Sequence, residues 1–222
     1  MSEGLVAVID ALPYMLQGAG VTIGVVVGAM GLGLLMGVPF AVGQVYGGRW
    51  LRRLIGIYAW FFRGIPLLVL LFLFYFGICP LLNLNLSAFT VAVIVLGSIG
   101  AAYQSQIFRG AILSLPEGQL RAARALGMSD AGAILFIILP QALRLAIPAW
   151  SNEYSIVLKD SAVTYALGVA EIMARTHFVA TRTYEHLPLY LAAGFVYLIL
   201  TYAGTKALRE LEKKVKIPGY SH

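Results

Sequence analysis

The chain has 222 residues, of which 60% are hydrophobic and only 12% are charged, and its mean hydropathy is +0.85. Soluble domains carry about 45–50% apolar and about 25% charged residues, so this composition excludes an ordinary soluble enzyme and a disordered chain. A disulfide-stapled secreted domain is also excluded, because Cys79 is the single cysteine. The sequence predicts one all-α integral membrane domain over residues 1–222, with length for about five spans.

Five apolar stretches are long enough to cross a bilayer, at residues 21–42, 55–82, 86–113, 133–158 and 187–208. In the first stretch, Gly20, Gly24 and Gly28 are spaced four apart, and Gly33 and Gly37 repeat the step. Small residues at this spacing allow a second helix to approach closely in lipid.

Prolines interrupt two of these stretches. Pro66 and Pro80 fall in the second, and Pro66 is expected to kink its helix because it removes a backbone donor. Pro140 and Pro148 fall in the fourth, which is expected to break into a short segment followed by a helix.

Basic residues are distributed unevenly along the chain. The N-terminal tail has no Lys or Arg, which argues against a signal peptide, whereas residues 206–216 contain five. Because cytoplasmic segments carry the excess of Lys and Arg, we expect the N-terminus outside and the C-terminus in the cytoplasm. The net charge of +6 then reflects topology, so membrane lipid is an expected partner and nucleic acid is not.

Residues 115–140 do not read as a simple membrane span. Pro116 favours a helix start, residues 119–126 are amphipathic and alanine-rich, and Gly127 favours a helix end. Ser129 or Asp130 can then cap a second helix over residues 131–139, which Pro140 is expected to end. Such an element is a candidate to dock into a groove on a soluble partner, and a plain loop is the alternative.

The same segment carries a recognisable pattern. Ala122-Ala123, then Gly127, Ile137 and Leu139-Pro140 at their spacing resemble the EAA motif of ABC importer permeases. Further ordered blocks, spread over about residues 18–208, are similar to the polar amino acid uptake permeases of the histidine, glutamine and arginine type. They are Phe62-Arg63-Gly64-Ile65-Pro66, Ile107-Phe108-Arg109-Gly110, Leu139-Pro140-Gln141 and Asn152-Glu153-Tyr154.

The resemblance implies a type I ABC importer permease fold with a cytoplasmic coupling helix, in a prokaryotic inner membrane. It implies a separate ATPase that carries ATP and Mg, a second permease subunit (a copy or a paralogue), an extracytoplasmic binding protein and an amino acid substrate. No cofactor is expected in this chain. The residues implied to couple the chain to the ATPase are Glu117, Gln119, Arg121, Ala122, Ala123, Arg124 and Gly127.

Two positions depart from the family pattern. Arg121 stands where the motif has an acidic residue, so any ion pair with the ATPase needs a rearranged partner. Gln106 stands where the family often has an acidic residue. Because that charge is lost, the substrate preference of a relative cannot be assigned directly to this chain.

Glu153 and Asp160 are the acidic pair best placed for substrate binding. Seven residues apart, they share a helix face at about 10 Å along the axis. An ionisable residue in a span usually faces a cavity or a partner. They are expected to attract cationic groups, which favours basic amino acids, and salt bridges to Arg63, Arg144 or Lys159 are the alternative.

Other polar residues complete the predicted substrate site. Arg63 is a candidate for a substrate carboxylate, and its alternative is a structural pairing with a carbonyl or an acid. Hydrogen-bonding groups are expected from Asn152, Ser161, Gln106 and Tyr103.

Catalysis finds little support. The sequence has no Gly-x-x-x-x-Gly-Lys-Ser/Thr phosphate loop, and its three histidines (177, 186 and 222) lack metal-ligand spacing. We therefore expect neither catalytic residues nor a metal site. An ion-coupled secondary transporter or channel is the alternative function, although it leaves the helix–glycine–helix element unexplained.

Overall fold

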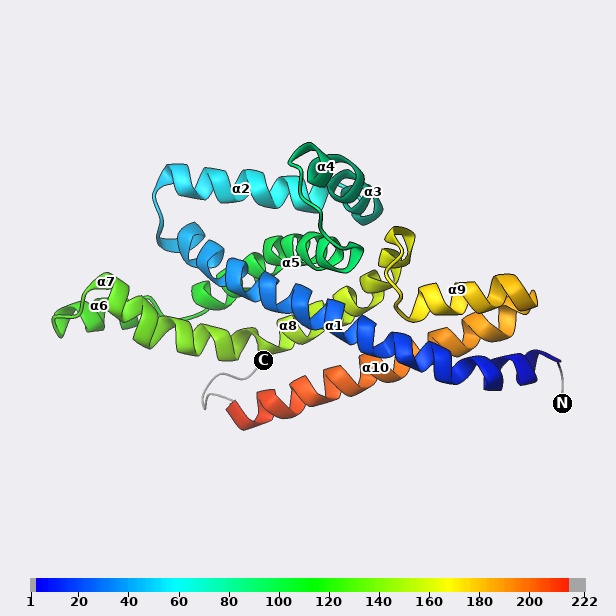
Figure 1. The fold of residues 1–222 in the computed structure, drawn as a ribbon. Coiled ribbons are helices and arrows are strands. Elements are labelled where there is room, and N and C mark those ends of the chain that lie inside the picture. Colours follow the sequence, from blue (N-terminus) through cyan, green and yellow to red (C-terminus); the bar gives the residue numbers. More distant parts are fainter. Residues whose placement is uncertain (1–2, 216–222) are drawn as a thin grey trace.

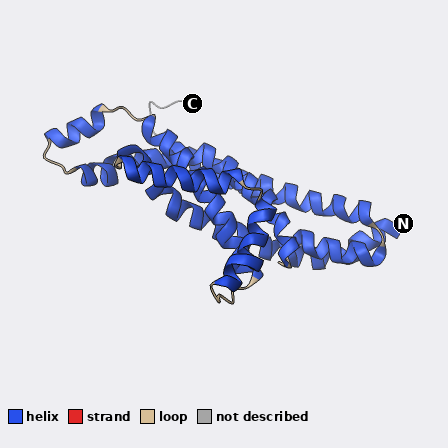
Figure 2. Ribbon diagram, turned by 90° about the horizontal axis from the view of Figure 1, so that it is seen from above, coloured by secondary structure: helices blue, strands red, loops and turns tan. Residues whose placement is uncertain are grey.

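The computed structural model describes residues 3–215, so the predictions that involve Lys216 and His222 fall outside the described part. The described residues form helices joined by short loops, without a strand. Most helices run along one long axis (Figures 1 and 2). Their bounds are α1 Glu3–Tyr46, α2 Arg49–Gly64, α3 Leu67–Phe72, η1 Leu73–Ile78, α4 Cys79–Leu81, α5 Ala88–Leu113, α6 Gly118–Ala125, α7 Asp130–Ala133, η2 Ile134–Ile138, α8 Leu139–Asp160, η3 Ser161–Leu167, α9 Ile172–Thr183 and α10 His186–Val215.

The number of crossings agrees with the prediction. Four helices in the described part are long and apolar enough to cross a membrane, at Gly4–Tyr46, Ala88–Leu113, Asp130–Leu167 and His186–Val215. A fifth arises if α2 and the segment Leu67–Leu81, bent by 105° at Pro66, count as one broken span. The expected kink at Pro66 is therefore present, and the all-helical fold with about five crossings is confirmed.

The first helix is much longer than the predicted stretch 21–42. It runs unbroken from Glu3 to Tyr46, through Pro13 and Pro39. Its glycine stripe packs along α5, because the missing side chains leave room for the neighbouring helix. A Cβ at Gly28 would lie 2.9 Å from Val93, and one at Gly37 would lie 3.1 Å from Gln104.

The expected breaks at Pro140 are wrong. Pro140 neither ends a helix over residues 131–139 nor divides the fourth stretch, since Asp130–Leu167 runs as one candidate span. A π-helical turn, η2, ends two residues before Pro140, and another, η1, ends two residues before Pro80. A π turn shifts the hydrogen-bond register by one residue, which accommodates a residue that has no N–H to donate.

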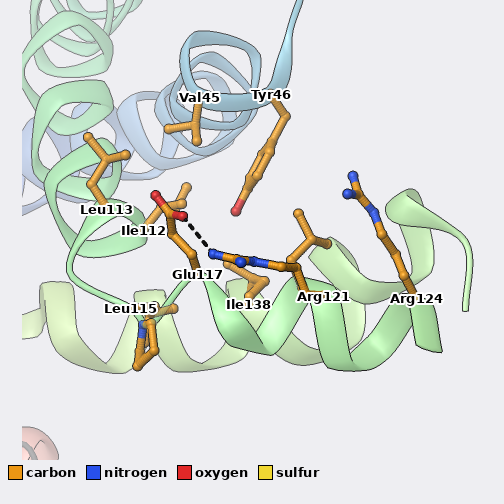
Figure 3. Close-up of a pocket in the computed structure, with 11 residues that line it drawn as sticks. Val45, Tyr46, Ile112, Leu113, Leu115, Glu117, Arg121, Arg124 and Ile138 are labelled. Atoms are coloured by element: carbon orange, nitrogen blue, oxygen red, sulfur yellow. Dashed lines mark hydrogen bonds and ion pairs between the residues drawn. The ribbon is translucent and has the colours of Figure 1, made fainter. Parts of the chain in front are cut away.

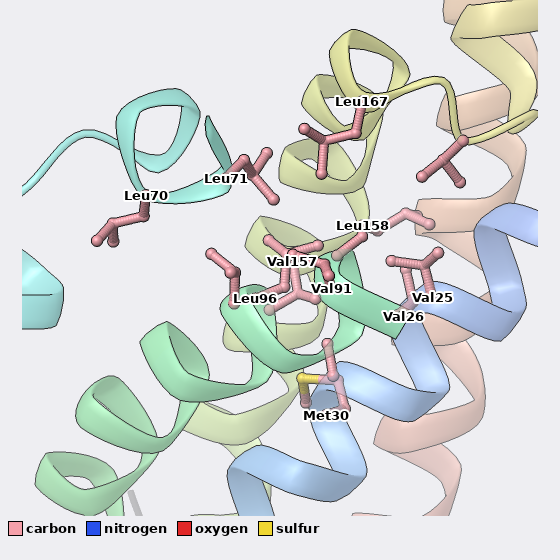
Figure 4. Close-up of a cluster of buried hydrophobic side chains, with 14 of the residues drawn as sticks. Val25, Val26, Met30, Leu70, Leu71, Val91, Leu96, Val157, Leu158 and Leu167 are labelled. Carbon is pink, nitrogen blue, oxygen red and sulfur yellow. The ribbon is translucent and has the colours of Figure 1, made fainter. Parts of the chain in front are cut away.

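The main hydrophobic core joins α1, α3, α5 and the end of α8. Figure 4 shows Val26 and Met30 of α1 facing Val91 and Leu96 of α5, with Val157 and its neighbour Leu158 beside them. Cys79 is also buried in this cluster, as expected of a small apolar side chain. This packing fixes α8 beside α5 and α3, which positions the polar face of α8.

Candidate functional site

A cavity of about 260 Å³ lies between α2, α5 and α8. Four of the seven residues predicted to bind substrate come together here: Glu153 and Asp160 from α8, Arg63 from the end of α2, and Tyr103 from α5. The remaining wall is apolar and consists of Phe62, Ile65, Leu67, Ile99 and Ile156.

The two carboxylates occupy one stripe of α8. Glu153, Ile156 and Asp160 are spaced by three and four residues, and all three line the cavity. Glu153 is only 5% exposed. Within residues 3–215, neither carboxylate forms a salt bridge, so the alternative pairing with Arg63, Arg144 or Lys159 is not observed.

Arg63 is held at the edge of the cavity by an aromatic ring. Its guanidinium carbon lies 4.8 Å from the ring centroid of Tyr103, within the range of a cation–π interaction. Arg63 and Tyr103 also line an adjoining cavity of about 450 Å³ together with Gln106. The amide nitrogen of Gln106 donates to Gln44 Oε1 at 3.0 Å, which links α5 to α1.

Two predicted residues lie elsewhere. Ser161 is fully buried, and its hydroxyl donates to the carbonyl oxygen of Leu158 at 2.7 Å. Asn152 lines a different cavity, between α8 and α10, because adjacent helical residues point about 100° apart. The apolar wall was missed from sequence, since an apolar residue in a span carries no signal of its own.

The coupling segment folds largely as predicted. Helix α6 begins at Gly118, two residues after Pro116, and Gly127 adopts φ +80 just beyond its end. The Ser129 hydroxyl caps α7 by accepting from the Gly132 amide at 3.2 Å. The segment lies at the opposite end of the molecule from the N-terminus and α9 (Figure 1).

Helix α6 is tied to the rest of the chain by polar pairs. Gln119 and Gln141 of α8 exchange hydrogen bonds at 3.0 and 2.9 Å, and Ala123 is buried. Arg124 forms a bidentate ion pair with Asp130 at 2.7 and 2.9 Å. The pair raises the pKa of Arg124, first through the hydrogen bond and then through the charge of Asp130.

Arg121 and Ala122 of α6 are both exposed to solvent. Arg121 pairs with Glu117 at 3.2 Å, one turn back, and both side chains are largely exposed. Figure 3 shows this pair across a cavity of about 380 Å³ from Val45 and Tyr46 of α1. An exposed pair of this kind stabilises little, so Arg121 remains available to a partner.

Metal binding finds no support in the described part of the chain. Among residues 3–215, no three His, Cys, Asp or Glu side chains lie close enough together to hold a metal ion. His177 instead hydrogen-bonds Tyr190, at 2.8 Å.

Known proteins resemble this chain over most of its length. Residues 29–217 match the family described as binding-protein-dependent transport system inner membrane component. The arginine transport system permease protein ArtQ of Bacillus subtilis is 32% identical over 210 residues, covering 95% of this chain and 96% of the relative. The histidine/lysine/arginine/ornithine transport system permease protein HisM of Salmonella typhimurium is 32% identical over 210 residues, which cover 90% of this chain and 89% of the relative.

Solved structures show the same fold. An amino acid ABC transporter crystallised with histidines has a chain with TM-score 0.84 and 30% identity, covering 96% of this chain and 100% of that one. The MetNI methionine ABC transporter, inward facing, gives TM-score 0.82 at 20% identity over 98% of this chain, a likeness of fold alone.

Proposed function

The chain belongs to the family of binding-protein-dependent transport system inner membrane components, and from this premise we propose that it carries polar amino acids, with a preference for basic ones. It is a permease subunit of an ABC importer, and its fold is that of a type I importer permease. The sequence has no phosphate-binding loop, so a separate ATPase subunit supplies the energy.

One observation carries the preference for basic substrates. Glu153, Asp160 and Arg63 line one cavity in the membrane region without forming ion pairs to one another. A basic amino acid such as arginine or lysine carries two cationic groups and one carboxylate at neutral pH, which complements two carboxylates and one guanidinium. The relatives named for arginine and for histidine, lysine, arginine and ornithine support the same preference.

The roles of the residues follow from their positions. Glu153 and Asp160 hold the two cationic groups of the substrate, and Arg63 holds its carboxylate at the end of α2. Tyr103 keeps the Arg63 guanidinium in place through its ring. Gln106 offers a neutral amide at the adjoining cavity and does not select for charge.

Transport itself is a conformational change. Closure of the ATPase moves α6, and the Gln119–Gln141 pair passes that motion to α8, which carries Glu153 and Asp160. A second permease subunit, a copy or a paralogue, completes the translocation pathway. An external binding protein delivers the substrate at the end that carries α9, and the C-terminal end of α10 faces the cytoplasm.

Reconstitution tests the function directly. The permease, its ATPase and its binding protein are placed in liposomes, and ATP-driven uptake of labelled arginine, lysine, histidine, glutamine and glutamate is compared. We expect the fastest uptake for arginine and lysine. Uptake that follows an ion gradient and needs no ATP would contradict the proposal and favour the secondary transporter.

Charge removal tests the site. Breaking one buried charge contact costs about 2 kcal/mol or more, so Glu153→Gln and Asp160→Asn should each raise KM for arginine about 30-fold. Glu185→Gln, outside the cavity, is the matched control and should transport normally. Unchanged KM in both cavity variants would reject the assignment of these carboxylates.

A further inference from the structure

A second polar cavity, of about 270 Å³, lies between α8 and α10, away from the cavity that holds Glu153. Polar groups from both helices line it. They are Ser151, Asn152 and Ser155 from α8, and Thr205, Arg209 and Glu212 from α10. The α8 residues form their own stripe, roughly a third of a turn around the helix from the Glu153–Asp160 stripe. A single helix therefore presents two polar faces to two separate cavities.

The charges of this cavity are unpaired among the described residues. Arg209 and Glu212 are three residues apart, a spacing at which helical side chains can pair, yet neither forms an ion pair within residues 3–215. On the same helix, Glu210 and Lys213 have the same spacing and do pair, at 2.8 Å. Arg209 and Glu212 thus leave one cationic and one anionic group facing one cavity.

Two hydroxyl groups that line the cavity donate their protons to backbone carbonyl oxygens. Thr205 donates its proton to the carbonyl oxygen of Thr201 at 2.8 Å, and Ser155 donates to that of Ser151 at 3.4 Å. Each hydroxyl oxygen is therefore left as an acceptor, suited to an ammonium group.

The cavity lies at the end of α10 that is rich in Lys and Arg. Lys206, Lys213 and Lys214 flank Arg209 along this segment, and this excess of basic residues predicts that it lies at the cytoplasmic boundary of the membrane. A ligand reaches the cavity from the cytoplasm or from the inner leaflet, and not along the route of an incoming substrate.

We propose that the α8–α10 cavity is a second ligand site, which binds a zwitterion whose ammonium and anionic groups are a few bonds apart. Arg209 binds the anionic group, and Glu212 with the hydroxyls of Ser155 and Thr205 binds the ammonium. This chemistry has two sources, a free α-amino acid and the phosphoethanolamine headgroup of a lipid. A bound zwitterion fastens α8 to α10 and so restrains the helix that carries Glu153 and Asp160.

The amino acid source has a functional consequence, which rests on the proposed function. The imported product would occupy the site from the cytoplasmic side and slow further import, while a lipid headgroup would instead stabilise one arrangement of α8. Both sources act through Arg209 and Glu212, so the same variants test both.

Binding is measured on the purified permease–ATPase complex in detergent, by thermal unfolding with arginine, with glycerophosphoethanolamine and with glycerol. We expect one of the two zwitterions to raise the Tm of the complex. Glu153→Gln should keep this response, whereas Arg209→Gln and Glu212→Gln should each need at least tenfold more of the zwitterion for the same rise in Tm. Lys206→Gln and Glu210→Gln are the matched controls outside the cavity and should respond as wild type. Stabilisation by glycerophosphoethanolamine alone supports the site and assigns the lipid as its source.

The proposal is overturned if neither zwitterion stabilises the complex, or if both cavity variants bind as wild type does. In liposomes, the ratio of ATP-driven uptake with and without internal arginine is the second measurement. If arginine is the ligand, internal arginine should lower uptake several-fold in wild type and not in Arg209→Gln. Failure of the proposed function looks different, because uptake would then be absent while the thermal response to the zwitterion persists.

Discussion

The buried carboxylate of Glu171 offers the sharpest test of how the end of the molecule that carries α9 is held together. Glu171 is fully buried just before α9, where Oε1 accepts from the Ala174 amide at 2.6 Å and Oε2 from the Met173 amide at 2.9 Å. The Tyr197 hydroxyl of α10 donates to the same Oε2. Gly18 of α1 packs so closely that a Cβ there would lie 2.8 Å from the Glu171 backbone. The Glu171 side chain therefore joins the start of α9 to α10, and its backbone packs against α1.

The cost of Glu171→Ala can be worked out from these bonds. Loss of the helix cap costs about 1 kcal/mol. The Tyr197 hydroxyl is left buried without its partner, which adds about 1–3 kcal/mol. The sum of about 2–4 kcal/mol corresponds to a fall in Tm of about 4–16 °C for a chain of this size. Tyr197→Phe should cost less, about 1 kcal/mol, because Glu171 keeps both amide donors.

Thermal unfolding of the purified complex in detergent measures these differences. Glu185→Ala, in the link between α9 and α10, is the control. If Glu171→Ala lowers Tm no more than Glu185→Ala does, the carboxylate does not hold these helices together and the reasoning is refuted.

The same residue gives a pH prediction. Burial raises the pKa of Glu171 above its ordinary value of 4.5, against the hydrogen bonds from Tyr197, Met173 and Ala174, which lower it. The folded state then holds the proton more tightly than the unfolded state. Stability should fall as pH rises from 4.5 through the raised pKa. Glu171→Gln should remove this part of the pH dependence of Tm, and an unchanged profile would contradict the assignment.

Three further predictions concern transport and packing. Gly127→Val should uncouple ATP hydrolysis from uptake, because a β-branched residue resists the φ of +80 that Gly127 adopts. Gly118→Ala is the control. Coupled transport in Gly127→Val would count against a functional role for the turn. Gly28→Ala should destabilise the folded protein by about 1–3 kcal/mol, because the added Cβ overpacks on Val93. Gly31→Ala is the control, since a Cβ there meets nothing within 4 Å. Equal Tm values for the two variants would argue against the α1–α5 contact. If Arg121 pairs with an acidic residue of the ATPase, Arg121→Glu should weaken assembly of the permease with the native ATPase, measured by co-purification. Stronger assembly would show that the ATPase residue facing Arg121 is not acidic.

The sequence by itself determined the class of protein and the approximate number of its spans. Long apolar stretches need a membrane, and their number follows from length alone, so about five crossings were predictable. The turn at Gly127 and the cap at Ser129 were predictable too, because each depends on the local preferences of a few neighbouring residues. The shared face of Glu153 and Asp160 follows from helical periodicity, which is likewise local.

Only the tertiary structure decided which residues meet. It placed Arg63 and Tyr103 of other helices beside Glu153 and Asp160, and it sent Asn152 to a separate cavity with Arg209. It also carried the helix through Pro140, where a π turn absorbs the missing donor, although the local sequence predicted an end. The physical reason is that helix rotation and packing depend on contacts between distant segments, and a single chain of apolar residues does not reveal which face of each helix those contacts will bury.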